Sequence, residues 1–424
     1  MKKSLSKKWD GGLFIFVYWI LYYLLHSTNL LFFRENPRYG TIINLCLKLF
    51  YLYIIVIYLL SKKRLIKARS LTNFIPLILV LFLGWIFSSI LWTKSNFNVA
   101  ILYWSISIIE IVPIFIFIKI WDIKKIIYYT TRGIVVGGII LAFIGIWNGF
   151  DSIGRLGNDE FLHPNILGNL LAISSISCLG ILSEQKRLNN EHNLRYFVIL
   201  IYLLILLLLT VSKTAIISFF VVFLIFVLAN KSSKREKIIL ILFFVLITVQ
   251  LYISYINSYL SNYMQNEKYL YTLTGRTIIW EYTWRMIKLS PLIGYGFFAF
   301  REIGPQIAAI RLGSAHNDYL NVIFNFGFIG LFLYLGVIID YIRKLILVSF
   351  FAKKQYESEF IISLLFLIYF SIRGFSEANF ATINFVLPLL ILLVSLLTCI
   401  GRKENLVSCS VDNNTKKIKS IYKY

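Results

Sequence analysis

The sequence has few acidic residues and few cysteines. Asp and Glu number 20 against 43 Lys and Arg, so the formal net charge is +23. The four cysteines include no close pair, which argues against a disulfide framework and a C-x-x-C zinc site. The apolar run after the basic amino terminus lacks a small-x-small cleavage site. We therefore predict that this run is a retained first helix and not a signal peptide.

Hydrophobic residues, in contrast, are abundant. They make up 58% of the 424 residues, and the mean hydropathy of +0.76 is far above that of soluble globular proteins. Apolar runs of roughly 17 to 25 residues recur, each long enough to cross a bilayer core of about 30 Å. We predict an all-α polytopic membrane protein with about twelve transmembrane helices. The expected helices are 11–32, 41–60, 74–92, 99–118, 126–147, 165–182, 196–211, 214–229, 237–255, 318–340, 358–374 and 381–400.

The basic residues are clustered between alternate apolar runs. The amino-terminal MKKSLSKK, the loop SKKRLIKAR and the carboxy-terminal tail are examples, while the opposite loops carry fewer Lys and Arg. By the positive-inside rule we expect both termini in the cytoplasm. Because topology accounts for the positive charge, nucleic acid is not expected as a partner.

One connection, on the predicted outer side, is about sixty residues long, and loops of that size are often functional. We therefore predict four parts along the chain. They are helices one to nine (1–255), the extracytoplasmic loop (256–317), helices ten to twelve (318–400) and a cytoplasmic tail (401–424).

Within this loop, TGRTIIWEYTWRMIKLSP has the spacing of an amphipathic helix. Ile279, Trp280, Thr283, Trp284 and Ile287 share one face, and charged Glu281, Arg285 and Lys288 share another. Such a helix is either an interfacial anchor, with Arg276 meeting lipid phosphate, or part of a functional site.

The stretch GSAHNDYL places a histidine where the tenth crossing begins. With Ser314 as N-cap, His316 and Asn317 would fall in the first turn, where backbone N–H groups lack intrahelical partners. These groups and the helix dipole favour an anion and a neutral imidazole. His316 is therefore a candidate base next to an anionic leaving group. The alternative is a histidine that only caps the helix or lies at the lipid interface.

Other ionisable residues lie toward the same predicted face. They are Lys213 in TVSKTA, Arg155 in RLGNDEF, and Arg373 and Glu377 in SIRGFSEANF. Ionisable groups at such depth usually face a cavity or a charged partner. These groups could therefore converge with His316 on one outer cavity.

An ordered set of motifs resembles the O-antigen ligase/polymerase superfamily of bacterial envelope glycan assembly. The motifs are RLGNDEFLHPN, TVSKTA, GRTIIW, PLIGYG, HNDYL and NFGFIG, and the resemblance spans roughly residues 155 to 379. It implies a membrane-embedded glycosyltransferase of the bacterial inner membrane, with its active site on the outer face. The implied donor is a glycan linked to polyprenyl (undecaprenyl) diphosphate.

The resemblance also implies roles for individual residues. An outer-face histidine of the family activates the acceptor hydroxyl, and basic residues hold the diphosphate. The predicted site consists of catalytic His316, diphosphate-binding Arg276, Lys213 and Arg155, and supporting Asn317, Asp318, Glu377 and Arg373. Lys213 departs from the usual arginine, so it keeps the charge but lacks the planar, bidentate guanidinium.

The residue types agree with this chemistry. Departure of a lipid diphosphate from the anomeric carbon develops negative charge, which Arg and Lys stabilise without a metal. The outer loops contain no D-x-D pair, so we expect neither a metal nor a cofactor. Attack opposite the leaving group would invert the anomeric centre.

Several functions remain open on the sequence alone. We prefer a polymerase that joins lipid-linked repeat units into O-antigen, capsule or exopolysaccharide. A ligase would instead transfer the finished glycan to a lipid A core or another acceptor. A flippase for the same lipid would usually show two related halves and polar residues near the bilayer midplane, and a structural scaffold would not need His316. The expected partners are the glycan donor, a lipid-borne acceptor, membrane lipids and other envelope assembly proteins.

Overall fold

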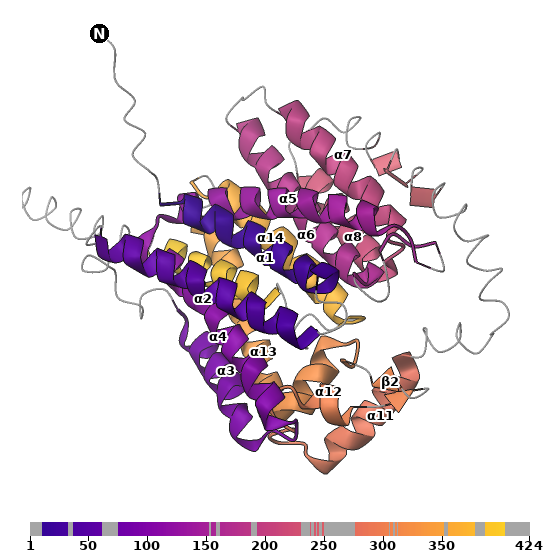
Figure 1. The fold of residues 1–424 in the computed structure, drawn as a ribbon. Coiled ribbons are helices and arrows are strands. Elements are labelled where there is room, and N and C mark those ends of the chain that lie inside the picture. The colour runs from indigo at the N-terminus through magenta and orange to yellow at the C-terminus, as the bar shows by residue number, and fades with distance from the viewer. Residues whose placement is uncertain are drawn as a thin grey trace, which may run out of the picture. The chain divides into compact units, whose positions relative to one another are not determined.

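The computed structural model falls into two compact units, each built from segments distant in sequence (Figure 1). It describes residues 11–32, 37–61, 75–151, 154–157, 162–187, 193–229, 238, 241–242, 244–245, 248–249, 276–304, 306–307, 310–311, 313–351, 355–377 and 386–402. Unit 1 comprises Met1–Tyr58, Lys124–Glu281 and Leu365–Glu377, and unit 2 comprises Leu59–Ile123, Tyr282–Leu364 and Ala378–Tyr424.

Unit 1 consists of helices packed through small residues and buried hydroxyls. Its helices are α1 (Leu13–Phe32), most of α2 (Pro37–Ser61), α5 (Ile123–Asn148), α6 (Pro164–Arg187), α7 (Asn193–Leu209), α8 (Lys213–Ala229), the beginning of α11 (Arg276–Leu289) and the end of α14 (Glu357–Gly374). Helix α1 lies against α5, where a Cβ on Gly133 would come within 2.6 Å of the carbonyl oxygen of Phe16. The hydroxyl of Tyr23 donates to the carbonyl oxygen of Leu170 at 3.1 Å, which joins α1 to α6.

Unit 2 is arranged around the long helix α13 (Asp318–Phe351). Its other elements are α3 (Leu77–Ser88), the short η2 (Ser89–Trp92), α4 (Phe97–Ile120), α12 (Ala299–Ile303), the paired strands β1 (Gln306–Ile307) and β2 (Ile310–Arg311), the helix Val386–Arg402, and the remaining parts of α11 and α14. Helix α3 packs along α13, with the ring centroids of Phe82 and Tyr334 5.8 Å apart.

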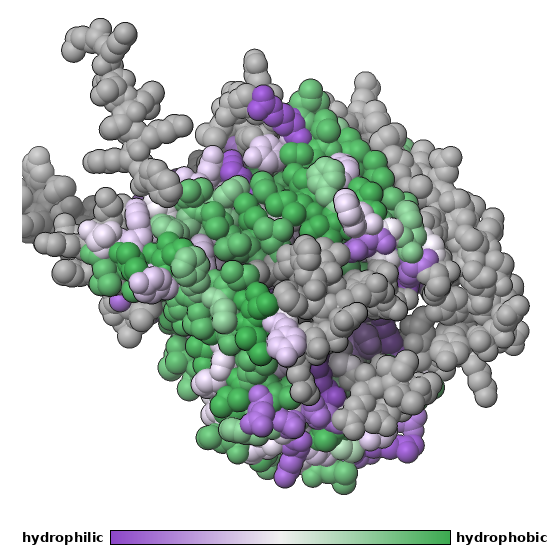
Figure 2. All heavy atoms as spheres, viewed as in Figure 1, coloured by the Kyte–Doolittle hydropathy of each residue, from purple (hydrophilic) through white to green (hydrophobic). Residues whose placement is uncertain are grey.

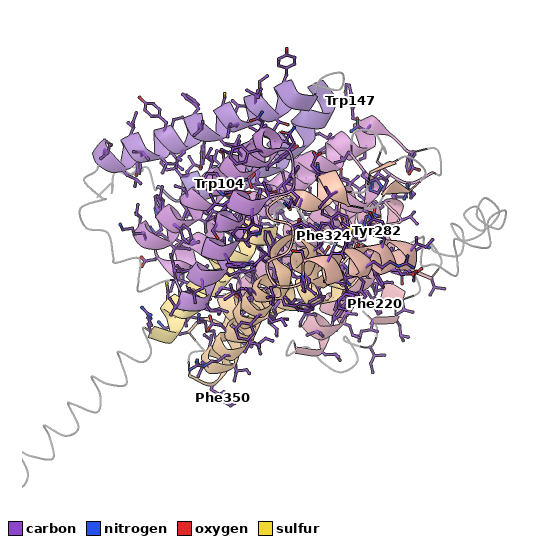
Figure 3. The ribbon with its side chains drawn as sticks, turned by 90° about the horizontal axis from the view of Figure 1, so that it is seen from below. Trp104, Trp147, Phe220, Tyr282, Phe324 and Phe350 are labelled. Atoms are coloured by element: carbon purple, nitrogen blue, oxygen red, sulfur yellow. The ribbon has the colours of Figure 1, made fainter. Side chains whose placement is uncertain are left out.

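The described chain carries the apolar surface of a membrane protein. Five helices are long and apolar enough to cross a membrane: Tyr39–Ser61, Phe97–Ile120, Ile123–Asn148, Pro164–Glu184 and Asp318–Phe350. Figure 2 shows hydrophobic residues over most of the visible surface of α1, α2 and α5. In Figure 3, Trp147 and Phe350 lie at the periphery, 87% and 78% exposed, whereas Phe324 is fully buried. Lipid would cover such exposed apolar side chains, so the protein is a multi-pass membrane protein.

The helices agree with the segments expected from the apolar runs. Every expected segment except 237–255 coincides with a described helix, and 237–255 lies largely outside the described residues. The count of twelve crossings therefore stays a prediction. Helix α13 differs from its expected form, because it continues past residue 340 to Phe351 and contains a non-helical residue, Gly327 (φ 69°, ψ −173°).

Candidate functional site

Arg276 and Glu377 form an ion pair in unit 1. Nη2 of Arg276, the first residue of α11, donates to Oε1 of Glu377 at 2.7 Å. Glu377 follows α14, where its backbone N–H donates to the carbonyl oxygen of Arg373 at 2.8 Å. The two paired side chains are 18% and 8% exposed, so little solvent screens the pair. A carboxylate thus holds the guanidinium that was predicted to bind diphosphate.

A second donor reaches the same carboxylate oxygen. Nδ2 of Asn165, at the beginning of α6, donates to Oε1 of Glu377 at 3.3 Å. One turn later, Oδ1 of Asn169 accepts a hydrogen bond from the hydroxyl of Tyr369 on α14 at 2.9 Å. Residues four apart lie on one face of a helix, so the two asparagines together join α6 to the end of α14. Neither asparagine was predicted as a site residue, although PNILGN already shows two amides at this spacing.

Lys213 begins α8 directly after a sharp break in the chain. Val211 has a left-handed backbone conformation (φ 49°). A Cβ on Gly168 of α6 would lie 2.6 Å from the Cβ of Ser212, so α6 closely approaches this break. Lys213 is an exposed residue, yet its pKa is lowered, first by partial desolvation and then by the positive charge of Arg276. Two cations of the predicted diphosphate site are therefore near enough to repel each other.

Arg373 adds a third cation to this part of unit 1. It lies one turn before Glu377 and is 6% exposed. The charges of Arg373 and Glu377 both act on the phenol of Tyr369. Unit 1 thus brings together Lys213, Arg276, Arg373 and Glu377, which we call the cation cluster.

Arg155 is engaged within its own loop. Its Nε donates to Oδ2 of Asp151 at 2.7 Å, and its backbone N–H donates to Oδ1 of the same carboxylate at 2.8 Å. The next residue, Leu156, donates its N–H to the carbonyl oxygen of Leu209 at the end of α7. The loop therefore lies against the break that precedes Lys213, with the guanidinium of Arg155 held by Asp151.

In unit 2, the segments PLIGYG (291–296) and NFGFIG (325–330) form one interlocked structure. The hydrogen bonds run from Tyr295 N–H to Phe324 C=O (2.9 Å), Gly296 N–H to Asn325 C=O (2.7 Å), Phe328 N–H to Pro291 C=O (2.8 Å) and Trp85 Nε1–H to Phe326 C=O (2.9 Å). A Cβ on Gly327 would lie 2.0 Å from the carbonyl oxygen of Leu292, and Gly327 also needs its positive φ. The turn supplies partners for the backbone groups that the break in α13 leaves without helical bonds.

His316 lies directly before the first half of α13. Asn317 caps the helix, because its Oδ1 accepts from the N–H of Leu320 and its carbonyl oxygen accepts from the N–H of Asn321, both at 3.0 Å. The expectation that Ser314 is the cap is therefore wrong, and its Oγ instead accepts from the N–H of His316 at 3.4 Å. His316 has a left-handed backbone (φ 47°), which is uncommon outside glycine and requires a well-determined setting.

The residues around His316 hold this loop against the helix. Oδ1 of Asn321 accepts from the N–H of Ala315 at 3.2 Å. Ala315 and Asp318 are fully buried, whereas His316 is partly exposed. An acidic residue in the first turn also suits the helix dipole. The imidazole is thus carried by a rigid connection between two buried residues.

The amphipathic helix predicted in the long loop is α11. Ile279, Thr283 and Ile287 are 4%, 0% and 1% exposed, so this part of the predicted face is confirmed. Trp284 is 42% exposed and lies outside the buried stripe. Residues 256–275, which precede this helix, lie outside the described chain.

The predicted site residues are divided between the two units. Unit 1 contains the cation cluster and Arg155, and unit 2 contains His316, Asn317 and Asp318. Among the residues described by the structure, no three His, Cys, Asp or Glu side chains gather to hold a metal ion.

Part of the chain is similar to a known protein family. Residues 198–335 match the family model described as O-antigen ligase. This match covers 138 of the 424 residues and supports the O-antigen ligase/polymerase superfamily. This confirms the resemblance seen in the motifs, and the matched region contains Lys213, Arg276 and His316, while Arg155 and Glu377 lie outside it. A search of curated proteins gives no match.

The match supports an activity of the O-antigen ligase/polymerase type in general. The family consists of glycosyltransferase-like enzymes that act on lipid-linked glycans. Together with the apolar helices, the match indicates a multi-pass protein of the bacterial inner membrane.

Proposed function

We propose that the protein polymerises polyprenyl-diphosphate-linked repeat units into a surface polysaccharide at the outer face of the membrane. The cation cluster is the observation that carries this proposal, because it occurs in a chain whose residues 198–335 match the O-antigen ligase family model. Arginine and lysine hold phosphate oxygens by charge-assisted hydrogen bonds. Lys213 and Arg276 are assigned to the donor diphosphate, with Arg155 as a further cation at the adjoining loop.

The proposed reaction is a direct displacement at the anomeric carbon of the donor. His316 accepts the proton of the acceptor hydroxyl as the hydroxyl oxygen forms the new C–O bond. The bond from the anomeric carbon to the diphosphate oxygen breaks, and its electron pair leaves with the diphosphate. Arg276 and Lys213 stabilise the developing negative charge without a metal or cofactor. Attack from the side opposite the diphosphate inverts the anomeric centre.

The supporting residues position these groups in the proposal. Asn317 caps the half-helix after His316, and Asp318 is buried in its first turn. Glu377 pairs with Arg276 from just after α14, and Arg373 lies one turn before Glu377. A rigid setting matters because a base acts only within hydrogen-bond reach of the proton that it accepts.

The test is glycan formation by the purified protein in lipid nanodiscs with EDTA present. Synthetic lipid-linked repeat units serve as both donor and acceptor. We compare the parent with His316→Ala, Arg276→Ala and the control Arg132→Ala, whose guanidinium pairs with Glu184 at 3.4 Å elsewhere in unit 1. We expect a ladder of products from the parent and the control, and rates lowered about 10²- to 10⁴-fold in His316→Ala.

The acceptor distinguishes polymerase from ligase. Product that forms only when a lipid A core or another distinct acceptor is added would identify a ligase. Movement of the lipid-linked unit between leaflets without any new glycosidic bond would identify a transporter. Full activity in folded His316→Ala and Arg276→Ala would contradict the site assignment.

A further inference from the structure

Glu377 binds the guanidinium of Arg276, which the proposed function assigns to the donor diphosphate. Its Oε1 accepts from Nη2 of Arg276 at 2.7 Å and from Nδ2 of Asn165 at 3.3 Å. The bond uses one of the five N–H donors of the guanidinium. Under the proposed function, this carboxylate therefore takes a guanidinium N–H that a phosphate oxygen of the donor would bind.

The charges of the cluster fit an exchange of anions. Lys213, Arg276 and Arg373 supply three positive charges and Glu377 one negative charge, which leaves an excess of two. A diphosphate diester carries one negative charge on each phosphate, so it matches this excess. A phosphodiester headgroup of an ordinary phospholipid carries a single charge. The doubly charged ligand thus gains more from the cluster than the singly charged one does.

We propose that Glu377 is a resident counter-ion of Arg276 that the donor diphosphate displaces and ordinary phospholipid headgroups do not. The inference rests on the proposed function, because it assigns the specificity of the same donor site. Membrane phospholipids greatly outnumber any lipid-linked glycan, so an unoccupied arginine there would fill with the wrong phosphate. A competing carboxylate makes the net binding free energy of every anion at Arg276 less favourable. Only the doubly charged diphosphate then binds strongly enough to displace it, and the singly charged phosphodiester does not.

Asn165 keeps the displaced carboxylate of Glu377 close to Arg276. Because its amide donates to the same Oε1, it can retain the carboxylate when Arg276 turns to the donor. The displaced charge then keeps one of its two hydrogen bonds and stays at the beginning of α6. Glu377 is in this sense a specificity-determining residue that acts through Arg276.

The experiment measures binding of a polyprenyl-diphosphate monosaccharide to the full-length protein in nanodiscs. One set of nanodiscs contains zwitterionic lipid alone, and the other contains phosphatidylglycerol as about one-fifth of the lipid. The variants are Glu377→Gln, which is isosteric but uncharged, and Glu377→Ala, which removes the carboxylate. The control is Glu184→Gln, which uncharges the matched Arg132–Glu184 pair of unit 1.

In zwitterionic lipid, both Glu377 variants are expected to bind the probe about tenfold more tightly than the parent. The reason is that they lack the carboxylate that competes with the probe for Arg276. Phosphatidylglycerol should then weaken their binding about tenfold and the binding of the parent by less than about twofold. Glu184→Gln should behave like the parent in both lipids. A merely structural role of Glu377 would not produce sensitivity to phosphatidylglycerol.

Two outcomes would overturn the inference in different ways. If Arg276→Ala weakens probe binding but neither Glu377 variant tightens it or becomes sensitive to phosphatidylglycerol, Glu377 only positions Arg276. If Arg276→Ala leaves probe binding unchanged, or the parent does not bind the probe, the proposed donor site fails and the counter-ion role fails with it. Measuring two Glu377 variants keeps the test decisive if one of them does not fold.

Discussion

At the scale of the single residue, the charge of Lys213 depends on its neighbours. Partial desolvation and the positive charge of Arg276 lower its pKa below the ordinary value of 10.5. Between the lowered pKa and 10.5, the unfolded chain binds more protons than the folded protein. Lys213 therefore makes the free energy of unfolding rise with pH in that window. Binding of an anionic donor has the opposite dependence, because deprotonation removes the attraction.

Replacing Lys213 by arginine should extend activity toward alkaline pH. The guanidinium stays charged where the lysine loses its proton, so Lys213→Arg should remain active to a pH at least about one unit higher. Initial rates from neutral to alkaline pH, at donor concentrations below KM, measure this shift. Lys124→Arg at the start of α5 controls for the substitution itself. Alkaline limbs that coincide in the parent and Lys213→Arg would show that the charge of Lys213 is not used for the donor.

At the scale of the element, α13 consists of two helical segments that are separated by a break at Gly327. The break at Gly327 separates the half that carries His316 from the long apolar half, and the PLIGYG turn fills it. Discontinuous helices are found in membrane proteins where irregular backbone is buried in protein or lines a functional cavity. The interlock fixes the far end of the half-helix that His316 precedes.

Gly327→Ala should destabilise the protein by at least about 2 kcal/mol, because the new Cβ meets a carbonyl oxygen and a positive φ is strained. The clash would be with Leu292, 2.0 Å away. Thermal unfolding in detergent should show a lower Tm. Gly84→Ala in α3 is the matched control, since nothing lies within 4 Å of its Cβ. Equal Tm values for the two variants would argue against a rigid interlock.

The helices could be predicted from the sequence, but the break in α13 could not. Apolar runs identify helices because local hydrophobicity decides which segments enter a membrane. The break depends on partners at 291–296, outside any local window around Gly327. The motifs PLIGYG and NFGFIG were recognised separately, and only the structure shows that they are halves of one interaction.

At the scale of the whole molecule, the sequence indicates which residue types the site contains but not which of them contact one another. Arg276 and Glu377 are 101 positions apart, and no local pattern pairs them. Asn165 was overlooked because a neutral amide gives no electrostatic signal in a sequence. The expected sidedness rests on the distribution of Lys and Arg between loops, which is a property of the entire chain.

Cysteine labelling tests that sidedness. In a cysteine-free variant, Gly313→Cys should react with a membrane-impermeant maleimide in intact spheroplasts, because residue 313 lies on the predicted outer side. Asp122→Cys, in a predicted inner loop, should react only after permeabilisation. Both positions are exposed, so burial does not limit the reaction. The reverse pattern would place His316 on the cytoplasmic side and contradict the proposed reaction.

The interlock in unit 2 also imposes an order on synthesis. Residues 291–296 leave the ribosome before residues 324–328, so the turn exists for a time without the backbone partners that it has in the finished protein. Unpaired N–H and C=O groups are costly in lipid. We expect the nascent turn to stay in a hydrated translocation channel until the second segment arrives, and a chain that ends at residue 323 to be degraded rapidly in a pulse-chase experiment.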